Sequence, residues 1–468
     1  MSFAKAHNYP WRQVTPGTYI QDYDSWQSVQ AIWNNVDREG RRLHMLASCI
    51  EIQSNITDLE SRLRSAWLAA RYFHPGLAIE LGEYYKAYRV PTAEELEAWV
   101  NDTFIMPACA NAEEFQKQHL STSPDSHLHW FPKTKQLLFT AHHTLFDATA
   151  LWLFWGAYLD LVISPKIVTF GDEWKNLPLA RDDLLGLPKY PSLAGNVKGL
   201  SMITNALKPD AIELPTLNTT TNSDGQVVPN GRSRNEFLRL ALSAEQSTAI
   251  IQACKRRGTS ITAAFFTAIS LTCQKIQREY GSAGRYAIGF HNFDSRPWFP
   301  RELASTVNAG NDPHAMIPFT VDLDGKSFED IAKITDENFK SIRADFGNDP
   351  AGLDAVSHML KGLLNLDGPI ATFPGFTSFG VADRVIKTAY HDEVGGWIKI
   401  EDSYHWIQNM VKGMNAVCVY NWKGRMYLGG CFNEAYHTKE MFHRLFRDSF
   451  DLILHTFNLG PMGPSSVL

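Results

Sequence analysis

The feature that most constrains the fold is a short polar cluster between two strongly apolar stretches. Residues 136–156 read QLLFTAHHTLFDATALWLFWG, in which two histidines end the first apolar run and an aspartate follows four residues after the second. The first run is typical of a buried strand, and the second is typical of a helix. His143 would then lie at a strand end, while Asp147 would begin a helix, where free backbone N–H groups favour a carboxylate. Such an edge is a common location for chemistry.

The rest of the chain alternates between strand-like and helix-like patterns, which indicates a mixed α/β fold. The run before His143 is expected to form a hairpin with residues 128–131, turning at residues 132–135. Further strands are expected in the segments 41–52, 376–381 and 416–433, and the segment 285–298 is expected to be a strand that runs into a loop. Helices are expected in the segments 57–73, 148–162, 243–258, 260–280, 327–342 and 439–457.

The length of the chain favours two domains. With 468 residues, of which 44% are hydrophobic, it is too long for one ordinary core. Regular periodicity fails between residues 164 and 234, a segment that contains the polar, turn-rich string PTLNTTTNSDGQVVPNGRSR. A segment of this kind is usually a linker or a functional loop. We expect an N-terminal domain at 1–175, a crossover at 176–234 and a C-terminal domain at 235–468.

Composition excludes several functional classes. The chain has 44 basic and 50 acidic residues, a net charge of -6, so we expect no nucleic-acid partner. Its six cysteines form no C-x-x-C pair, which is typical of reduced thiols in the cytosol and not of a disulfide scaffold. We find no secretory signal and no run of about 18 apolar residues. A cytoplasmic protein without a membrane partner is expected.

The chemistry of the cluster centres on His143. A histidine that titrates near neutral pH can take a proton from a hydroxyl and return it to a leaving group. No G-x-S-x-G elbow is present near it, which weighs against a serine acyl-enzyme. His143 is therefore the candidate general base on a bound substrate, and His142 is a second candidate. Asp147 could orient the imidazole, or it could turn away and form a buried ion pair.

Two other interpretations of the cluster stay open. A histidine on an apolar face is often a satisfied core residue without a chemical role. Histidine and aspartate are also metal ligands, and His127 or His129 in SHLHW could supply a third ligand. This spacing matches no standard zinc pattern.

The motif HHTLFDA resembles the HHxxxDG motif of peptide-synthetase condensation domains and the HxxxD motif of plant BAHD acyltransferases. Both belong to one superfamily with chloramphenicol acetyltransferase. Looser similarities extend along most of the chain, in SITAAFFTAIS, NFDSRPW and FTSFGV. Within this superfamily, the chain most resembles fungal secondary-metabolite O-acetyltransferases of the trichothecene 15-O-acetyltransferase kind.

This resemblance implies two chloramphenicol acetyltransferase-like α/β domains, each with mixed sheets flanked by helices, and an active-site tunnel between them. His143 would deprotonate an acceptor hydroxyl, which then attacks a thioester. Asp147 would be structural and paired with Arg296, and Ser378 in FTSFG would donate to the oxyanion. No resident cofactor is expected. Acetyl-CoA or another acyl-CoA would be the co-substrate, a hydroxylated natural product the acceptor, and the protein a monomer.

The basic run KRRG at residues 255–258 is a candidate binding site for the phosphates of CoA. Lys255 and Arg256 are the candidate binding residues. Basic residues at a helix C-terminus also occur simply as a solvated end that matches the helix dipole. Both interpretations stay open.

Three departures from the family patterns narrow the choice. The DFGWG motif of plant BAHD enzymes is absent. Ala148 replaces the glycine of HHxxxDG, and we expect no carrier or adenylation domain. The arginine that the family has in an early strand is missing near Ala78, so Arg296 would be the partner left for Asp147. An acyl-CoA-dependent O-acyltransferase fits best. The alternatives are amide formation from a carrier-bound thioester, a repurposed fold that cyclises a polyketide or terpenoid, and a metal-dependent hydrolase.

Overall fold

The computed structural model describes residues 8–33, 44–118, 125–217, 219–221, 223, 227–229, 234–300, 310–364, 372–408 and 413–461. The chain divides into two compact units, each assembled from three stretches that are distant in sequence. Unit 1 comprises Met1–Pro191, Asp294–Ala315 and Asp383–Ile407. Unit 2 comprises Ser192–Phe293, Met316–Ala382 and Gln408–Leu468.

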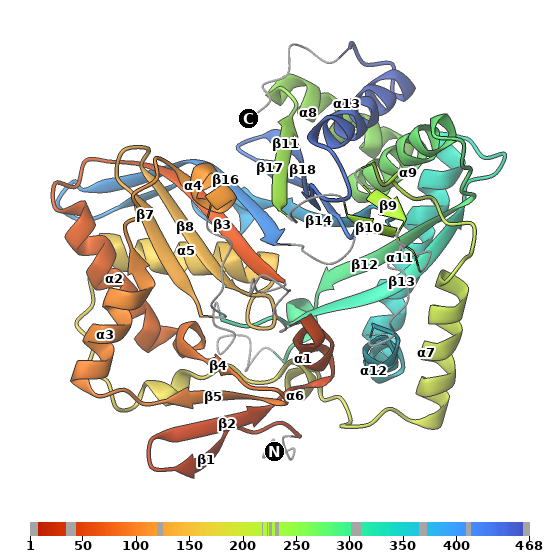
Figure 1. Cartoon of the computed structure of the whole chain (residues 1–468). Helices are drawn as coiled ribbons and strands as arrows, with labels where there is room; N and C mark the ends of the chain where they lie inside the picture. The colour runs from red at the N-terminus through yellow and green to blue at the C-terminus, as the bar shows by residue number, and fades with distance from the viewer. Residues whose placement is uncertain are drawn as a thin grey trace. The chain divides into compact units, whose positions relative to one another are not determined.

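Unit 1 is built on a six-stranded mixed sheet (Figure 1). Its strands, in spatial order, are β15 (Ala389–His391), β16 (Trp397–Gln408), β3 (Met45–Ser54), β8 (Gln136–His142), β7 (His127–Phe131) and β6 (Phe104–Ile105). The predicted hairpin is confirmed as β7–β8, and β8 also pairs antiparallel with β3. The predicted strand at 41–52 is observed from Met45, and residues 41–43 lie outside the described residues. A smaller sheet has the order β1 (Arg12–Thr15), β2 (Thr18–Asp22), β5 (Tyr85–Arg89) and β4 (Glu80–Leu81).

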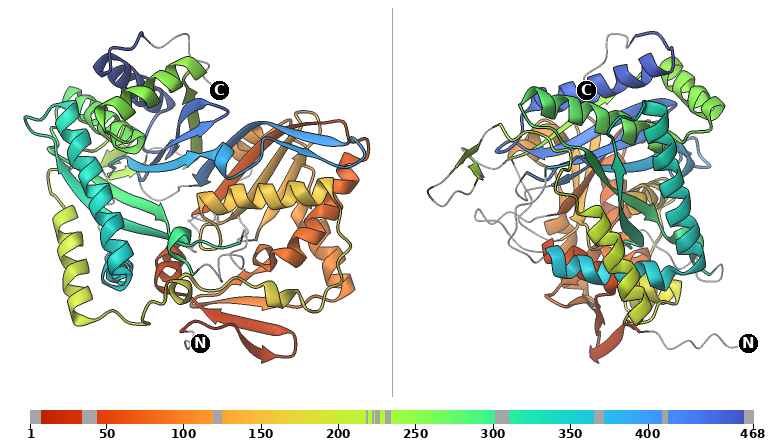
Figure 2. Two further views of the ribbon diagram at one scale, coloured as in Figure 1. Left: turned by 180° about the vertical axis from the view of Figure 1, so that it is seen from behind. Right: turned by 90° about the vertical axis from the view of Figure 1, so that its right-hand side faces the viewer.

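Helix α5 lies across one face of the six-stranded sheet (Figures 1 and 2). It is apolar almost all round and buries Trp155 and Phe154, whose rings pack against Phe139 of β8. A helix of this composition must be covered on most sides. The α-helices of unit 1 are α1 (Ser25–Gln30), α2 (Leu59–Phe73), α3 (Ala93–Thr103), α4 (Ala112–Gln118), α5 (Ala148–Ile163) and α6 (Arg181–Leu185). Short 3₁₀ turns are η1 (Ala31–Trp33), η2 (Pro75–Ala78), η3 (Glu173–Asn176) and η4 (Arg296–Trp298).

Unit 2 is built on a four-stranded mixed sheet covered by helices. The sheet has the order β11 (Asn235–Ala241), β18 (Arg425–Asn433), β17 (Ala416–Trp422) and β14 (Gly375–Val381). Two further pairs are β12 (Tyr286–Asp294) with β13 (His314–Asp322), and β9 (Thr219–Thr221) with β10 (Val227–Pro229). The helices are α7 (Leu193–Ala206), α8 (Ala244–Arg257), α9 (Ile261–Glu279), α11 (Phe328–Asn348), α12 (Pro350–Leu364) and α13 (Lys439–Thr456), with the turn η5 (Ala382–Arg384).

Helix α7 lies in the segment for which the sequence pattern predicted no regular element. It runs beside α12 (Figure 2). Its buried residues are mostly small: Gly195, Gly199 and Ala206, together with Ile203. A Cβ added to Gly199 would lie 3.1 Å from the α12 backbone, so glycine permits the close approach. Meanwhile Leu193 and Val197 face solvent. Because Ile203 is the one large residue among its four buried residues and several large apolar residues face solvent, this helix shows only a weak amphipathic period.

The predicted mixed α/β class is confirmed, with several mixed sheets and flanking helices. No described helix is both long enough and apolar enough to cross a membrane.

Candidate active site

The two adjacent histidines occupy different environments. His142 is the last residue of β8, is fully buried, and accepts a hydrogen bond at Nδ1 from the Thr144 N–H (3.2 Å). His143 follows the strand; its N–H donates to the His44 carbonyl (3.1 Å), and 16% of its side-chain surface is exposed. Because a reacting group must reach its substrate, His143 has the necessary access and His142 does not.

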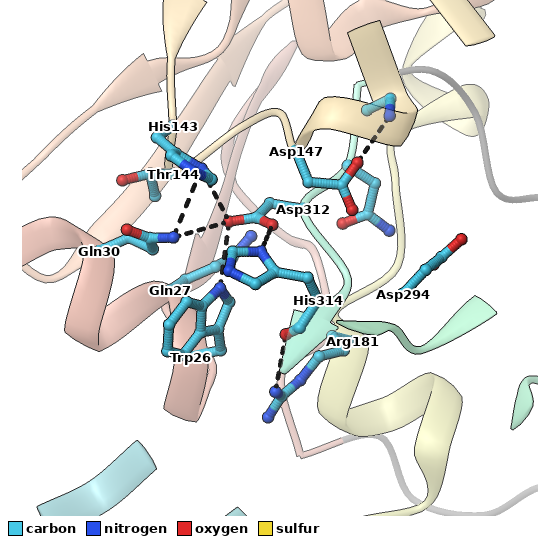
Figure 3. Close-up of polar contacts among 12 residues, drawn as sticks. Trp26, Gln27, Gln30, His143, Thr144, Asp147, Arg181, Asp294, Asp312 and His314 are labelled. Carbon is cyan, nitrogen blue, oxygen red and sulfur yellow. Dashed lines mark hydrogen bonds and ion pairs between the residues drawn. The ribbon is translucent and has the colours of Figure 1, made fainter. Parts of the chain in front are cut away.

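The Asp147 carboxylate is directed at the first turn of α5 (Figure 3). Its Oδ1 accepts a hydrogen bond from the Ala150 N–H (2.6 Å), an N-cap contact. Arg296 donates from Nη1 to Asp147 Oδ2 (2.9 Å) and from Nη2 to Asp147 Oδ1 (3.1 Å). Both side chains are largely buried, with 7% of Asp147 and 13% of Arg296 exposed. Of the two roles considered for Asp147, the geometry therefore shows the buried ion pair.

Arg296 also joins this helix start to a second segment. It donates from Nη1 to Asp294 Oδ1 (3.0 Å) and from Nη2 to the Asn311 carbonyl (3.3 Å). Burial alone would lower the pKa of Arg296, but Asp147 and Asp294 outweigh burial and raise that pKa. The guanidinium thus holds the loop after β8 and the segment before β13 through charge-assisted bonds.

Asp312, which sequence reasoning did not single out, supplies the carboxylate that faces His143. Figure 3 shows its carboxylate at the centre of a group of polar side chains. Its Oδ2 lies 3.5 Å from His143 Nδ1, and its Oδ1 is in a short hydrogen bond with His314 Nδ1. Asp312 has no exposed side-chain surface, while His314 keeps 14%. The only sequence signal was the string D-P-H immediately before an alternating strand.

Helix α1 supplies two neutral donors to the same carboxylate. Trp26 Nε1 and Gln30 Nε2 each donate to Asp312 Oδ2 at 3.2 Å. Gln30 Oε1 accepts a hydrogen bond from His44 Nε2 (2.7 Å), so the amide N–H end of Gln30 is left to face Asp312. The His44 ring stacks on the His143 ring, with centroids 4.6 Å apart.

The charges of the group follow from burial and these contacts. Burial alone would raise the pKa of Asp312, but His314 and the hydrogen bonds from His143 and His314 hold that pKa well below its usual range. Burial alone would lower the pKa of His143, but the hydrogen bond to Asp312 and its charge raise it. Burial, and next His143, lower the pKa of His44 well below its usual value. A carboxylate beside one accessible imidazole of raised pKa is suited to proton transfer.

The cluster also contains the ligand types of a metal site. The ligand atoms of His143, Asp312 and His314 lie within 4.8 Å of one another. His127 and His129, considered as third ligands, instead lie on β7, where each Nδ1 contacts a backbone carbonyl. Both rings of the cluster direct Nδ1 at one carboxylate, which already accepts two bonds from α1. This arrangement fits a hydrogen-bond network, and a metal ion would have to displace its donors.

We therefore expect the purified protein to hold no stoichiometric zinc, and its catalytic rate to be unchanged after dialysis against EDTA. Elemental analysis and a turnover assay before and after dialysis check this. One zinc ion per chain, with activity lost on its removal and restored by zinc, would instead support a metal-dependent hydrolase.

Ser378 lies on β14 of unit 2. Its Oγ is 3.2 Å from Thr262 Oγ1 in the first turn of α9, and the side chain is partly exposed. The register of β14 shifts between Ser378 and Gly380, and Gly380 has a φ of 77°. Such bulges re-aim side chains and are frequent beside active sites.

Lys255 and Arg256 are exposed in the last turn of α8. Next to them lies a cavity of about 350 Å³ within unit 2. Its walls include Arg257, Lys333 and Lys340, together with acidic and aromatic side chains. Basic side chains therefore line a cavity near the predicted phosphate-binding site, but Lys255 and Arg256 themselves are not among its lining residues.

The comparisons with known proteins agree with this description. No family model matches the chain. It is 22% identical over 456 residues to the O-acetyltransferase pigM of Monascus ruber. This match covers 91% of this chain and 83% of pigM. Its structure matches the TRI3 trichothecene 15-O-acetyltransferase from Fusarium sporotrichioides with a TM-score of 0.75 at 17% identity, covering 96% and 97% of the two chains. It matches the condensation domain of the monacolin K polyketide synthase MokA with a TM-score of 0.63 at 11% identity, covering 95% and 98%.

These matches confirm the resemblance noted in the sequence. The fold is that of chloramphenicol acetyltransferase-like acyltransferases and condensation domains. In sequence, the chain is similar to two proteins of Monascus ruber that are named as acetyltransferases, pigM and pigO.

Proposed function

We propose that the protein is an acyl-CoA-dependent O-acyltransferase that transfers an acetyl group to a hydroxyl of a secondary metabolite. The observation that carries this proposal is His143, a partly exposed histidine with a carboxylate at its Nδ1. The relatives support the reaction class, since pigM is named as an O-acetyltransferase and TRI3 as a trichothecene 15-O-acetyltransferase.

The proposed reaction needs no covalent enzyme intermediate. His143 takes the proton from the acceptor hydroxyl as its oxygen attacks the thioester carbonyl of acetyl-CoA. The tetrahedral intermediate collapses with cleavage of the carbon–sulfur bond, which yields the acetyl ester and the CoA thiolate. The imidazolium of His143 then returns its proton to the thiolate, so the enzyme regains its starting state. Asp147 and Arg296 hold the loop that carries the base.

Ser378 is the proposed donor to the oxyanion of that intermediate. Replacing it by alanine is expected to lower kcat by about 10²–10³-fold, the range for loss of one oxyanion donor. Substrate KM should change little, because the charge develops only in the transition state. Thr377→Ala, which removes the adjacent hydroxyl on the same strand, is the matched control. Equal kinetics for both variants and wild type would remove Ser378 from the mechanism.

The proposal is tested by the release of free CoA thiol from acetyl-CoA. A panel of hydroxylated polyketides and terpenoids is supplied as acceptors, and each is compared with a reaction that lacks acceptor. Without acceptor, we expect slow thiol release by background hydrolysis of acetyl-CoA. With at least one acceptor, thiol release should be faster, and the acetyl ester of that acceptor should form. Failure of the protein to bind any acyl-CoA would contradict the proposal.

A carrier-bound donor is the second candidate, because the fold also matches the MokA condensation domain. The same acceptors are then offered with an acetylated phosphopantetheinyl carrier protein in place of acetyl-CoA. Turnover with the carrier thioester and none with acetyl-CoA would assign the chain to condensation-type acyl transfer. Charge reversal of Lys255 and Arg256 separates the donors further. CoA brings a diphosphate and a 3′-phosphate for these cations to bind, whereas the carrier arm has a single phosphodiester, so turnover with CoA should fall more.

A further inference from the structure

The surroundings of Asp312 are unusual for a purely structural carboxylate. Its direct partners among the described residues are two neutral donors of α1 and the two histidines, His143 and His314. No guanidinium of the described residues contacts this buried carboxylate, and the partners that it has restore its lost hydration only in part. Asp147, by contrast, has the bidentate arginine expected of a structural ion pair. The two aspartates therefore have different roles.

The contacts of Asp312 determine which nitrogen of His143 carries the proton. An ionised carboxylate accepts hydrogen bonds and cannot donate them, so the Nδ1 that faces it is the protonated nitrogen. The lone pair is then at Nε2, on a ring with exposed surface. Gln30 Nε2 also lies 3.4 Å from Nδ1, but this is a long contact, and the amide has a closer acceptor in Asp312 (3.2 Å).

Other titratable groups face this pair from neighbouring elements. They are His44, His142, His314, Asp147 and Lys86. Burial lowers the pKa of Lys86 to about 8, against the opposing effect of Asp24 and Asp312, so its charge is present in the acidic range. His44 stays neutral near pH 7 and adds no repelling charge. Asp312 is the carboxylate that contacts the His143 ring directly.

We propose that Asp312 is the positioning residue of His143. It keeps the imidazole in the Nδ1–H tautomer, turns Nε2 toward the acceptor hydroxyl and stabilises the imidazolium that forms when the proton is taken. Trp26, Gln30 and His314 hold the carboxylate in place. This inference rests on the proposed general-base function of His143. The arrangement parallels the role of the aspartate in a Ser-His-Asp triad, although here the nucleophile is the acceptor.

The test is Asp312→Asn, followed as the pH profile of kcat/KM for acyl transfer. The base acts in its neutral form, so the wild-type profile rises through the pKa of His143 and then reaches a plateau. Without the carboxylate the pKa of His143 should fall, so the rising part of the profile, its acid limb, should move to lower pH. The plateau should fall roughly 10²-fold, because an asparagine amide can donate to Nδ1 and select the wrong tautomer. If folded Asp312→Asn shows its acid limb at the same pH as the wild type, the proposal is overturned.

Asp354→Asn is the matched control. Asp354 is a buried carboxylate of α12 in unit 2 that accepts a hydrogen bond from the Ser357 hydroxyl (3.3 Å) and lies 3.9 Å from His358 Nε2. The same substitution there should lower the melting temperature and leave the acid limb in place. A shift of equal size in the control would show that the profile reports general destabilisation, which would also overturn the proposal.

A second readout does not depend on turnover. Nitrogen-15 NMR of histidine-labelled protein reports the tautomer and pKa of His143, assigned by comparison with His143→Gln. We expect an Nδ1–H tautomer in the wild type that is lost in Asp312→Asn. If the wild type transfers no acyl group but shows this change, the proposed function fails and the pairing stands. If turnover is present and the tautomer is unchanged by the substitution, the pairing fails.

If Asp312→Asn does not fold, Trp26→Phe tests the proposed role of Asp312 instead. It removes one donor from Oδ2 and retains an aromatic ring in a fully buried position. The carboxylate then interacts more strongly with His143, so the acid limb should move to higher pH, opposite to the effect of Asp312→Asn. An unmoved limb in folded Trp26→Phe would overturn the proposal.

Discussion

Replacing His143 by alanine is expected to lower kcat/KM for acyl transfer by about 10²–10⁴-fold, the usual contribution of a positioned general base. The loss should appear mainly in kcat, since the imidazole acts on the proton in the transition state. The side chain is partly exposed at a strand end, so the melting temperature should change little. Steady-state kinetics with acetyl-CoA and thermal unfolding of the same preparation measure both quantities.

His391→Ala is the matched control, because His391 is an exposed histidine at the end of β15 in the same unit. This variant should retain wild-type kinetics. Near-normal turnover by His143→Ala, or an equal loss in both variants, would contradict the assignment of His143 as the base.

Replacing Asp147 by alanine is expected to reduce the free energy of unfolding by about 4 kcal/mol in total, from the lost ion pair and the lost helix cap. Breaking a buried ion pair commonly costs about 3–5 kcal/mol, and Asp294 remains on the Arg296 guanidinium, which favours the lower value. Loss of the N-cap of α5 adds about 1 kcal/mol. Urea unfolding followed by tryptophan fluorescence, together with kinetics on the folded protein, tests this expectation.

Asp147→Asn separates the two contributions. Asparagine retains a side-chain oxygen that can cap α5, but it lacks the charge that pairs with Arg296. This variant should therefore be more stable than Asp147→Ala by about the value of the cap and less stable than the wild type. Loss of activity in both variants with unaltered unfolding would contradict the structural role of Asp147.

Local sequence patterns predicted the elements that position the base. Helix α5 begins directly after Asp147, and β8 ends at His142, as the change from an apolar run to a capped helix indicated. Helix α2 ends before His74 and Pro75, where proline stops a helix. These features depend on residues within one or two turns of each other, which is the range that periodicity and capping describe.

Contacts between distant segments were predictable only where a family motif marked both partners. Arg296 lies 149 residues from Asp147, and the resemblance of DSRPW supplied that pairing. Asp312 meets Gln30 and Trp26 across 282 and 286 residues. Those two donors lie on a six-residue helix too short to show a period, and D-P-H is a common loop string. No local pattern could therefore bring Asp312 to His143.

Helix α7 was not predicted from the sequence, for a different reason. Three of its four buried residues are small (Gly195, Gly199 and Ala206, beside Ile203), while Leu193, Val197 and Leu200 face solvent. Sequence methods recognise a helix by burial of large apolar residues, and a helix that packs through glycine reverses that signal.

The central claim, acyl transfer from acyl-CoA to a hydroxyl with His143 as the base, is tested most directly by one product measurement. Wild type and His143→Ala are incubated in parallel with isotope-labelled acetyl-CoA and the acceptor panel, and the products are identified by mass spectrometry. We predict a labelled acetyl ester of at least one acceptor with the wild type, and little or none with the folded variant. Equal amounts of labelled ester from both proteins would contradict the role of His143, and no labelled product from the folded wild type would contradict acyl-CoA-dependent O-acyl transfer.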